Sequence, residues 1–174
     1  MKKLLRNKES LAKIIIFSLI VLVQASSSAA ELKPERWTKV CGDDKKCIVA
    51  IVKKVKDEKN KERTLATVYI QRVSSIDNKN KTVPLFFLNL PLNADLRRNP
   101  LVQVDGKKIT NLNFTHCNKQ IGCSTNIEIN DEVIEIFKTG KDLQITFGSF
   151  GSSDTISLIM PLKNFTKSYN SLIK

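Results

Sequence analysis

Short runs of β-branched and aromatic residues, each followed by a polar turn, limit the folds open to this chain of 174 residues more than any other feature. Such runs at hairpin spacing predict antiparallel strands. We expect strands at residues 37–41, 47–55, 64–73, 82–91, 101–109, 124–130, 141–148 and 155–162, although 47–55 is long enough to leave a helix as an alternative. The predicted fold class is therefore all-β, a mainly antiparallel β-sandwich or barrel-like fold, with two short helices.

Two local features refine the strand prediction. Asp105-Gly106 lies between β-type runs, and both central residues of a type I′ hairpin turn need positive φ, so residues 101–109 should form a hairpin. Pro84 and Pro91 lie in the most apolar run, 82–91. Because proline cannot donate to a β-ladder, this strand is expected at a sheet edge, or else to begin and end at its prolines.

Both predicted helices lie in the last third of the chain. In the first, residues 131–140, apolar side chains recur at helical spacing, acidic residues begin the segment, and Gly140 is placed to end it. The second runs from Asn164, the expected N-cap, to Ile173. Its apolar face would consist of Phe165, Tyr169, Leu172 and Ile173.

The first 30 residues are typical of a cleaved signal peptide. A basic start precedes the apolar run Ile14–Val23, and Ser28-Ala29-Ala30 places small residues at the positions that a signal peptidase requires. We expect cleavage after Ala30, which leaves one β-rich domain at residues 31–174; an uncleaved anchor is the alternative. The predicted location is the periplasm, the cell surface or the medium of a Gram-negative cell.

The chain is basic, with a formal net charge of +12. Removing the leader, which carries a net +4, leaves about +8 on the mature chain. This surplus favours anionic ligands such as lipopolysaccharide phosphates, acidic lipids or glycans, although a basic surface can also serve solubility alone. The candidate anion-binding residues are Arg97, Arg98, Lys107 and Lys108. Nucleic acid is not an expected partner of an exported protein.

Four cysteines occur as two copies of the spacing C-x5-C, Cys41 with Cys47 and Cys117 with Cys123. An even number of cysteines in an exported chain favours disulfides, and four cysteines allow three connectivities. We favour the two local pairs, because each would close a short turn that contains a glycine. A zinc site that adds His116 is the alternative, but its spacing is wider than that of most zinc knuckles.

The sequence displays no catalytic motif. His116 is the only histidine, no G-x-S-x-G occurs, and adjacent carboxylates fall in turns or at a helix start. Cys117 and Cys123 could form a reactive thiol pair beside His116, but redox centres typically use C-x-x-C. We therefore predict no catalytic residue, no metal ligand and no cofactor.

Six short blocks follow one another along the chain in a recognisable order. They are Trp37-Thr-Lys-Val-Cys41, Leu90-Pro-Leu-Asn-Ala-Asp-Leu96, Leu101-Val-Gln-Val-Asp-Gly106, Phe114-x-x-Cys117 with Gly122-Cys123, Ile136 to Gly140, and Leu162-Lys-Asn-Phe165. This order resembles the invasion-associated locus B family, exported proteins of alphaproteobacteria. The family's central block is closer to Leu-Pro-Leu-Gly-Val followed by a glycine, whereas Asn93, Ala94, Arg98 and Asn99 stand here.

The resemblance implies a periplasmic or surface-exposed β-rich domain, linked in pathogenic members to entry into host cells. The expected function is that of a non-enzymatic binding or accessory factor, with envelope components or a host-cell surface as partners. The resemblance to this family supplies no catalytic residue. The alternatives are a periplasmic thiol-active or other small enzyme that uses Cys117, Cys123 and His116, and a basic module that binds lipopolysaccharide or acidic glycans.

Overall fold

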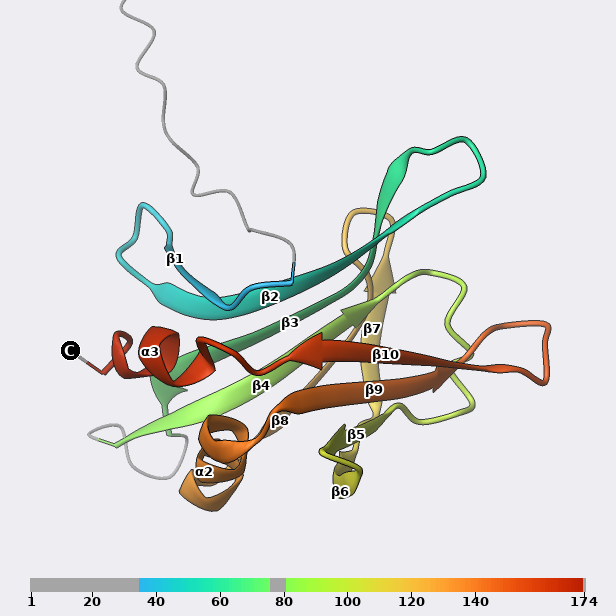
Figure 1. The fold of residues 1–174 in the computed structure, drawn as a ribbon. Coiled ribbons are helices and arrows are strands. Elements are labelled where there is room, and N and C mark those ends of the chain that lie inside the picture. Colours follow the sequence, from blue (N-terminus) through green and yellow to red (C-terminus); the bar gives the residue numbers. More distant parts are fainter. Residues whose placement is uncertain (1–34, 76–80, 174) are drawn as a thin grey trace, which may run out of the picture.

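Ten strands and two short helices make up the part of the chain that the computed structural model describes, residues 35–75 and 81–173 (Figure 1). The predicted signal peptide, residues 1–30, lies outside the described residues. Six strands form one antiparallel sheet, in the order β1 (Thr38–Cys41), β2 (Cys47–Lys56), β3 (Glu62–Ser74), β4 (Thr82–Leu90), β8 (Gly122–Glu128), β7 (Phe114–Asn118). Four form a second, in the order β10 (Thr155–Pro161), β9 (Asp142–Gly148), β5 (Leu101–Val104), β6 (Lys107–Asn111). The predicted all-β class, mainly antiparallel with two short helices, is confirmed.

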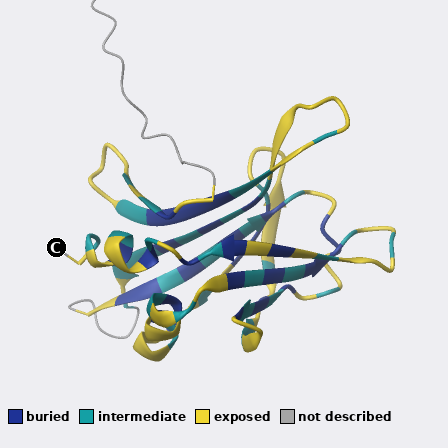
Figure 2. Ribbon diagram, in the orientation of Figure 1, coloured by how far each residue is buried: buried dark blue, intermediate teal, exposed yellow. Residues whose placement is uncertain are grey.

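The core lies between the two sheets, where alternate residues of each strand point inward. In β9, Leu143, Ile145 and Phe147 are buried as predicted, and they face the buried side chains of β3 and β4. Figure 2 shows burial concentrated in the middle of the strands, with exposed residues at the hairpin tips. The alternation read from the sequence therefore gives the correct inward face.

An aromatic cluster joins the helices to the core. Phe165 of α3 (Phe165–Asn170) is fully buried and makes edge contacts with Trp37, at 4.9 Å between ring centroids, and with Phe137 of α2 (Asp131–Thr139), at 5.6 Å. It also stacks on Tyr169 at 5.5 Å. Such pairs add about 0.5–1.5 kcal/mol each beyond the burial of their area. Neither helix within the described residues is long and apolar enough to cross a membrane.

The position of β4 corrects one expectation. The strand lies between β3 and β8 in the interior of the large sheet, not at an edge. Pro84 is tolerated there because its carbonyl accepts from the N–H of Ile129, at 3.0 Å, so its nitrogen faces the same neighbour, β8, which ends at Glu128. The N–H that Pro84 lacks would therefore have pointed past the end of β8, where no ladder bond is lost. Pro91 follows directly after the last residue of β4, as predicted.

Turn and cap predictions have mixed outcomes. Asp105 and Gly106 have φ of 50° and 77°, which confirms the type I′ turn. Helix α2 begins at the N-cap Asn130, whose side chain accepts from the N–H of Val133, and ends at Gly140 in an extended conformation. Asn164 occupies the predicted N-cap position of α3, and its carbonyl accepts from the N–H of Ser168 at 3.1 Å, but its φ is 71° and its side chain makes no capping hydrogen bond. Ile173 lies beyond α3 and is exposed, so it does not belong to the buried face.

Candidate functional site

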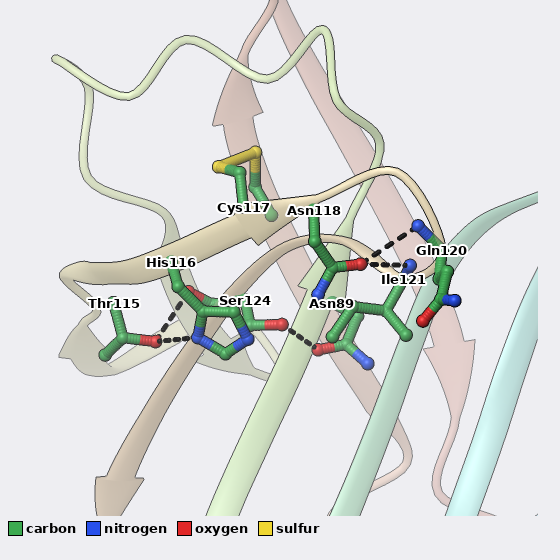
Figure 3. The surroundings of a disulfide bond; sticks show 9 residues. Asn89, Thr115, His116, Cys117, Asn118, Gln120, Ile121 and Ser124 are labelled. Carbon is green, nitrogen blue, oxygen red and sulfur yellow. Dashed lines mark hydrogen bonds between the residues drawn. A yellow bond between two sulfur atoms is a disulfide. The ribbon is translucent and has the colours of Figure 1, made fainter.

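The β7–β8 hairpin carries the cysteines and the histidine singled out in the sequence. Cys117 and Cys123 are directly opposite in the strand register and form a disulfide (Figure 3). The side chain of Asn118 accepts from the backbone N–H groups of Gln120 and Ile121, at 2.9 and 3.0 Å. The tip of the hairpin is thus closed both by a covalent bond and by an Asx turn.

The second predicted pair forms in the same way. Cys41 and Cys47 are opposite in the β1–β2 register and form a disulfide that closes their hairpin. Both local pairs favoured from the sequence are confirmed, and all four cysteines are used. No thiolate is left for the zinc alternative, and no cluster of three or more potential metal ligands occurs among the described residues.

His116 is exposed on the edge strand β7, beside the disulfide. Its Nδ1 lies 3.2 Å from the hydroxyl of Thr115, which also donates to the carbonyl of Ser124 at 3.0 Å (Figure 3). Within the described chain, no carboxylate hydrogen-bonds to the imidazole. Both sulfurs beside the imidazole are held in the disulfide, and the described residues of this hairpin supply no carboxylate to orient the ring as a catalytic triad requires.

A groove of about 700 Å³ lies beside this hairpin, at one end of the large sheet. Three segments far apart in the sequence line it: residues 63–67 of β3, residues 89–92 at the end of β4, and residues 119–122 at the hairpin tip. Figure 1 shows the β2–β3 and β7–β8 hairpins projecting side by side at this end. The pairing of β4 with both β3 and β8 brings the three segments together.

The lining of the groove is mixed in character. Leu92 and Ile121 contribute aliphatic surface that is about half exposed, 53% and 46% respectively. Asn89 supplies an amide, whose oxygen accepts from the hydroxyl of Ser124 at 2.7 Å, and the neighbouring threonines supply hydroxyls. Apolar walls with a few polar groups are typical of sites that bind through shape and hydrogen bonds.

The charges that line the groove are all positive. They are Arg63 and Lys119, and no carboxylate belongs to the lining. Arg63 is partly neutralised by Asp57, at 2.8 Å from its Nε, whereas Lys119 has no ion-pair partner among the described residues. The groove therefore suits a neutral or anionic ligand better than a cationic one.

Gly122 fixes the wall of the groove that the hairpin provides. Its φ is 83°, in the left-handed region, and a Cβ there would lie 2.0 Å from the carbonyl oxygen of Leu90. Only glycine allows the hairpin to approach β4 so closely. The disulfide, the Asx turn and this contact together hold the hairpin tip against the end of β4.

The adjacent arginines proposed for anion binding both contact a buried carboxylate. Asp95, 3% exposed, accepts from the side chain of Arg97 at 2.9 and 3.1 Å and from Nε of Arg98 at 3.1 Å. Hydrogen bonds from Arg97, together with its charge and that of Arg98, lower the pKa of Asp95 to about 2. Asp95 was not singled out in the sequence, because a lone Asp in a polar loop is ordinary.

The two arginines differ in what remains free. The guanidinium of Arg98 also donates to four carbonyls of the β9–β10 loop, those of Ser149, Ser152, Ser153 and Asp154. The side chain of Arg97 is 76% exposed, and its guanidinium carbon lies 5.9 Å from the centre of the Phe150 ring. The hydrogen bonds of Arg98 thus stabilise the β9–β10 loop, whereas the side chain of Arg97 faces solvent.

Lys107 and Lys108 are exposed on β6, just after the type I′ turn. The loop that carries the arginines leads into β5 at Leu101, which pairs with Asn111, whereas Lys107 pairs with Val104. The lysines therefore lie at the opposite end of this hairpin from the arginines. The structure does not bring the four basic residues into one cluster.

The comparisons with known proteins agree with the resemblance seen in the sequence. The model of the family "Invasion associated locus B (IalB) protein" matches residues 37–173. A solved structure, the crystal structure of invasion associated protein B from Bartonella henselae, matches with a TM-score of 0.62 and 21% sequence identity, over 79% of this chain and 91% of that one. No curated protein sequence matches significantly. The described fold and the family match together show that the chain belongs to the invasion associated locus B family.

Proposed function

We propose that this protein is an exported, non-enzymatic factor that binds an envelope or cell-surface component through the groove beside the Cys117–Cys123 hairpin. The observation that carries the proposal is the groove itself, about 700 Å³, with aliphatic, amide and cationic lining and a wall fixed by a disulfide. A preformed, rigid wall favours binding because little conformational entropy is lost when the ligand is bound.

Export is supported by the signal-like leader and by the use of all four cysteines in disulfides, which persist in oxidising compartments. The proposed mature chain begins at Glu31. Mass spectrometry of the protein from periplasmic and medium fractions tests this step. A mass equal to that of residues 31–174 with two disulfides is expected, and recovery of the full-length chain from the membrane fraction would contradict it.

Binding is tested with the mature chain as bait for solubilised envelope fractions. A double variant, L92S/K119E, changes the aliphatic wall and the free cation of the groove without touching the disulfide. The matched control is K167E, which reverses an exposed charge on α3. The wild type and K167E should retain the same component, and L92S/K119E should lose it. Equal retention by all three would contradict the proposed site.

The thiol-active alternative makes a different prediction. It needs Cys117–Cys123 to exchange with a dithiol, whereas the binding proposal treats both disulfides as structural. Titration of free thiols after exposure of the native protein to a glutathione buffer separates them. Inert disulfides support the binding role, and rapid, selective reduction of Cys117–Cys123 would support the enzyme.

The anion-binding alternative rests on Arg97, Lys107 and Lys108, which are exposed. Lys107 and Lys108 have no ion-pair partner among the described residues, whereas the exposed Arg97 is paired with Asp95. This alternative predicts that retention on an immobilised anionic glycan falls with salt and weakens in K107E/K108E. The control K39E/K167E changes the net charge by the same amount at other positions. If K107E/K108E and K39E/K167E are retained equally, only net charge matters and the proposed anion-binding residues are contradicted.

A further inference from the structure

Each sheet of the sandwich has two edge strands, and three of the four carry features that discourage pairing with another chain. β1 has four residues and ends at the disulfide cysteine Cys41, and β7 has an irregular register between Phe114 and His116 and carries a disulfide at Cys117. β6 has two lysines, and its ladder with β5 is irregular at Val102. Short length, bulges and lysines are the usual devices that protect sheet edges.

The fourth edge strand, β10, lacks these devices. Its seven residues, Thr155–Pro161, carry no charge and pair with β9 in an unbroken register. Ile159 is 55% exposed. A long, regular and uncharged edge is a template for a further strand.

The register shows which backbone groups of β10 are available. The N–H of Leu162 donates to the carbonyl of Lys141 at 2.7 Å, so Leu162 and every second residue before it point their backbone groups toward β9. Thr155, Ser157 and Ile159 therefore point theirs away. Pro161 agrees with this assignment, because its carbonyl accepts from the indole N–H of Trp37, at 3.0 Å, instead of from β9.

Trp37 and Pro161 together close one end of this edge, since the proline has no N–H and its carbonyl is occupied. No described residue pairs with the outward backbone groups of Thr155, Ser157 and Ile159. The open part of the edge is thus a five-residue segment, 155–159, with a donor and an acceptor at every second position.

We propose that this segment pairs with the same segment of a second copy of the chain, antiparallel about a two-fold axis at Ser157. Thr155 of each copy then lies opposite Ile159 of the other, and Ser157 lies opposite itself. The outward groups coincide in this register, which gives about six backbone hydrogen bonds between the copies. The two four-stranded sheets join into one continuous sheet across the dimer.

The chemistry of the edge favours a second copy over an unlike strand. The segment is self-complementary, since all of its outward residues are neutral and meet one another in pairs, and no charge selects an acidic or basic partner. The net positive charge of each copy opposes association at low salt. Dimerisation should therefore strengthen as salt is added, the opposite of what binding to an anionic partner would show.

Sedimentation equilibrium of the mature chain, from roughly 1 μM to 1 mM, should show a reversible monomer–dimer equilibrium, in the range expected of a small interface. S157K places two like charges directly opposite each other across the axis, and I159P removes one outward donor from each copy without affecting the ladder to β9. Each should weaken dimerisation by roughly tenfold or more. N111K, which adds the same charge at the opposite edge of the same sheet, should leave it unchanged.

Mixing two oppositely charged variants distinguishes loss of the dimer interface from loss of the fold. S157K and S157E should each dimerise more weakly than the wild type while folding with the wild-type circular dichroism spectrum, and their equimolar mixture should associate more strongly than either variant alone, because lysine then meets glutamate at the axis. A wild type that stays monomeric across the range would overturn the proposal. So would a dimer that S157K does not weaken, since its interface would then lie elsewhere.

Discussion

Removing the two disulfides one at a time tests how each supports the fold. Both close loops of equal length, with a sequence separation of 6. For a loop of about seven residues, the loss of chain entropy in the unfolded state corresponds to about 2.4 kcal/mol of stability for each bond. C41A/C47A and C117A/C123A should therefore differ only through what each bond contacts in the folded state.

Those contacts are unequal. Cys123 is 1% exposed, whereas Cys41 is exposed at the sheet edge. Removing one buried sulfur leaves part of its space empty, which adds roughly 1 kcal/mol to the loss in the free energy of unfolding. We expect C41A/C47A to lower the free energy of unfolding by about 2.4 kcal/mol and C117A/C123A by about 3.4 kcal/mol.

Urea unfolding followed by tryptophan fluorescence measures both values, with Trp37 as the single, fully buried reporter. The m-value should rise slightly in each variant, because an unfolded chain without the cross-link exposes more surface. A loss below about 0.5 kcal/mol for either pair would refute the entropy argument. A larger loss for C41A/C47A than for C117A/C123A would refute the reasoning from burial.

Three further outcomes can be checked by the same unfolding assay or by a pH titration. G122A should destabilise by more than G151A, because both glycines have positive φ but only at Gly122 would the new Cβ meet a backbone atom, the Leu90 carbonyl; equal losses would show that φ alone matters. Because the pKa of Asp95 is lowered to about 2, its contribution to stability is present above the unfolded value near 4 and is lost as the pH falls toward 2; in D95N this acid-dependent step should disappear from the stability profile. F165A should lower the free energy of unfolding by about 4 kcal/mol, since the ring is fully buried, and a loss below about 2 kcal/mol would mean that the cluster repacks.

The sequence predicts β9 from its buried face and misses β7, although β1 and β6, which also have no buried residue, were expected from their β-type residues and adjacent turns. β9 alternates buried and partly buried residues, and its pattern is visible in Leu143, Ile145 and Phe147. β7 was not predicted, because its residues after Phe114 are all exposed and carry no alternation. The sheet edge, one of the two alternatives expected for β4, was also wrong, because a proline excludes an interior strand only where its missing donor would face a partner.

The candidate site is harder to predict, for a physical reason. The groove forms only when β8 pairs with β4, which brings together residues about thirty and sixty positions apart, and no local pattern encodes that pairing. Arg98 illustrates the same difficulty at one residue. In sequence it is half of an exposed basic pair, whereas in the structure Gly148 leaves room for its guanidinium, and a Cβ at that position would lie 2.1 Å from its Nε.

The contacts of Trp37 also determine the order in which the fold can be completed. Its indole donates to Pro161 and its carbonyl accepts from Ser168, residues 124 and 131 positions away. A ribosome synthesises the N-terminal strand first, yet the pocket that receives Trp37 exists only after α3 has been made. The Trp37 side chain therefore cannot reach its buried position until α3 has formed, and a chain cut short before Phe165 would lack the ring that packs against the indole and would leave the indole exposed to chaperones and proteases.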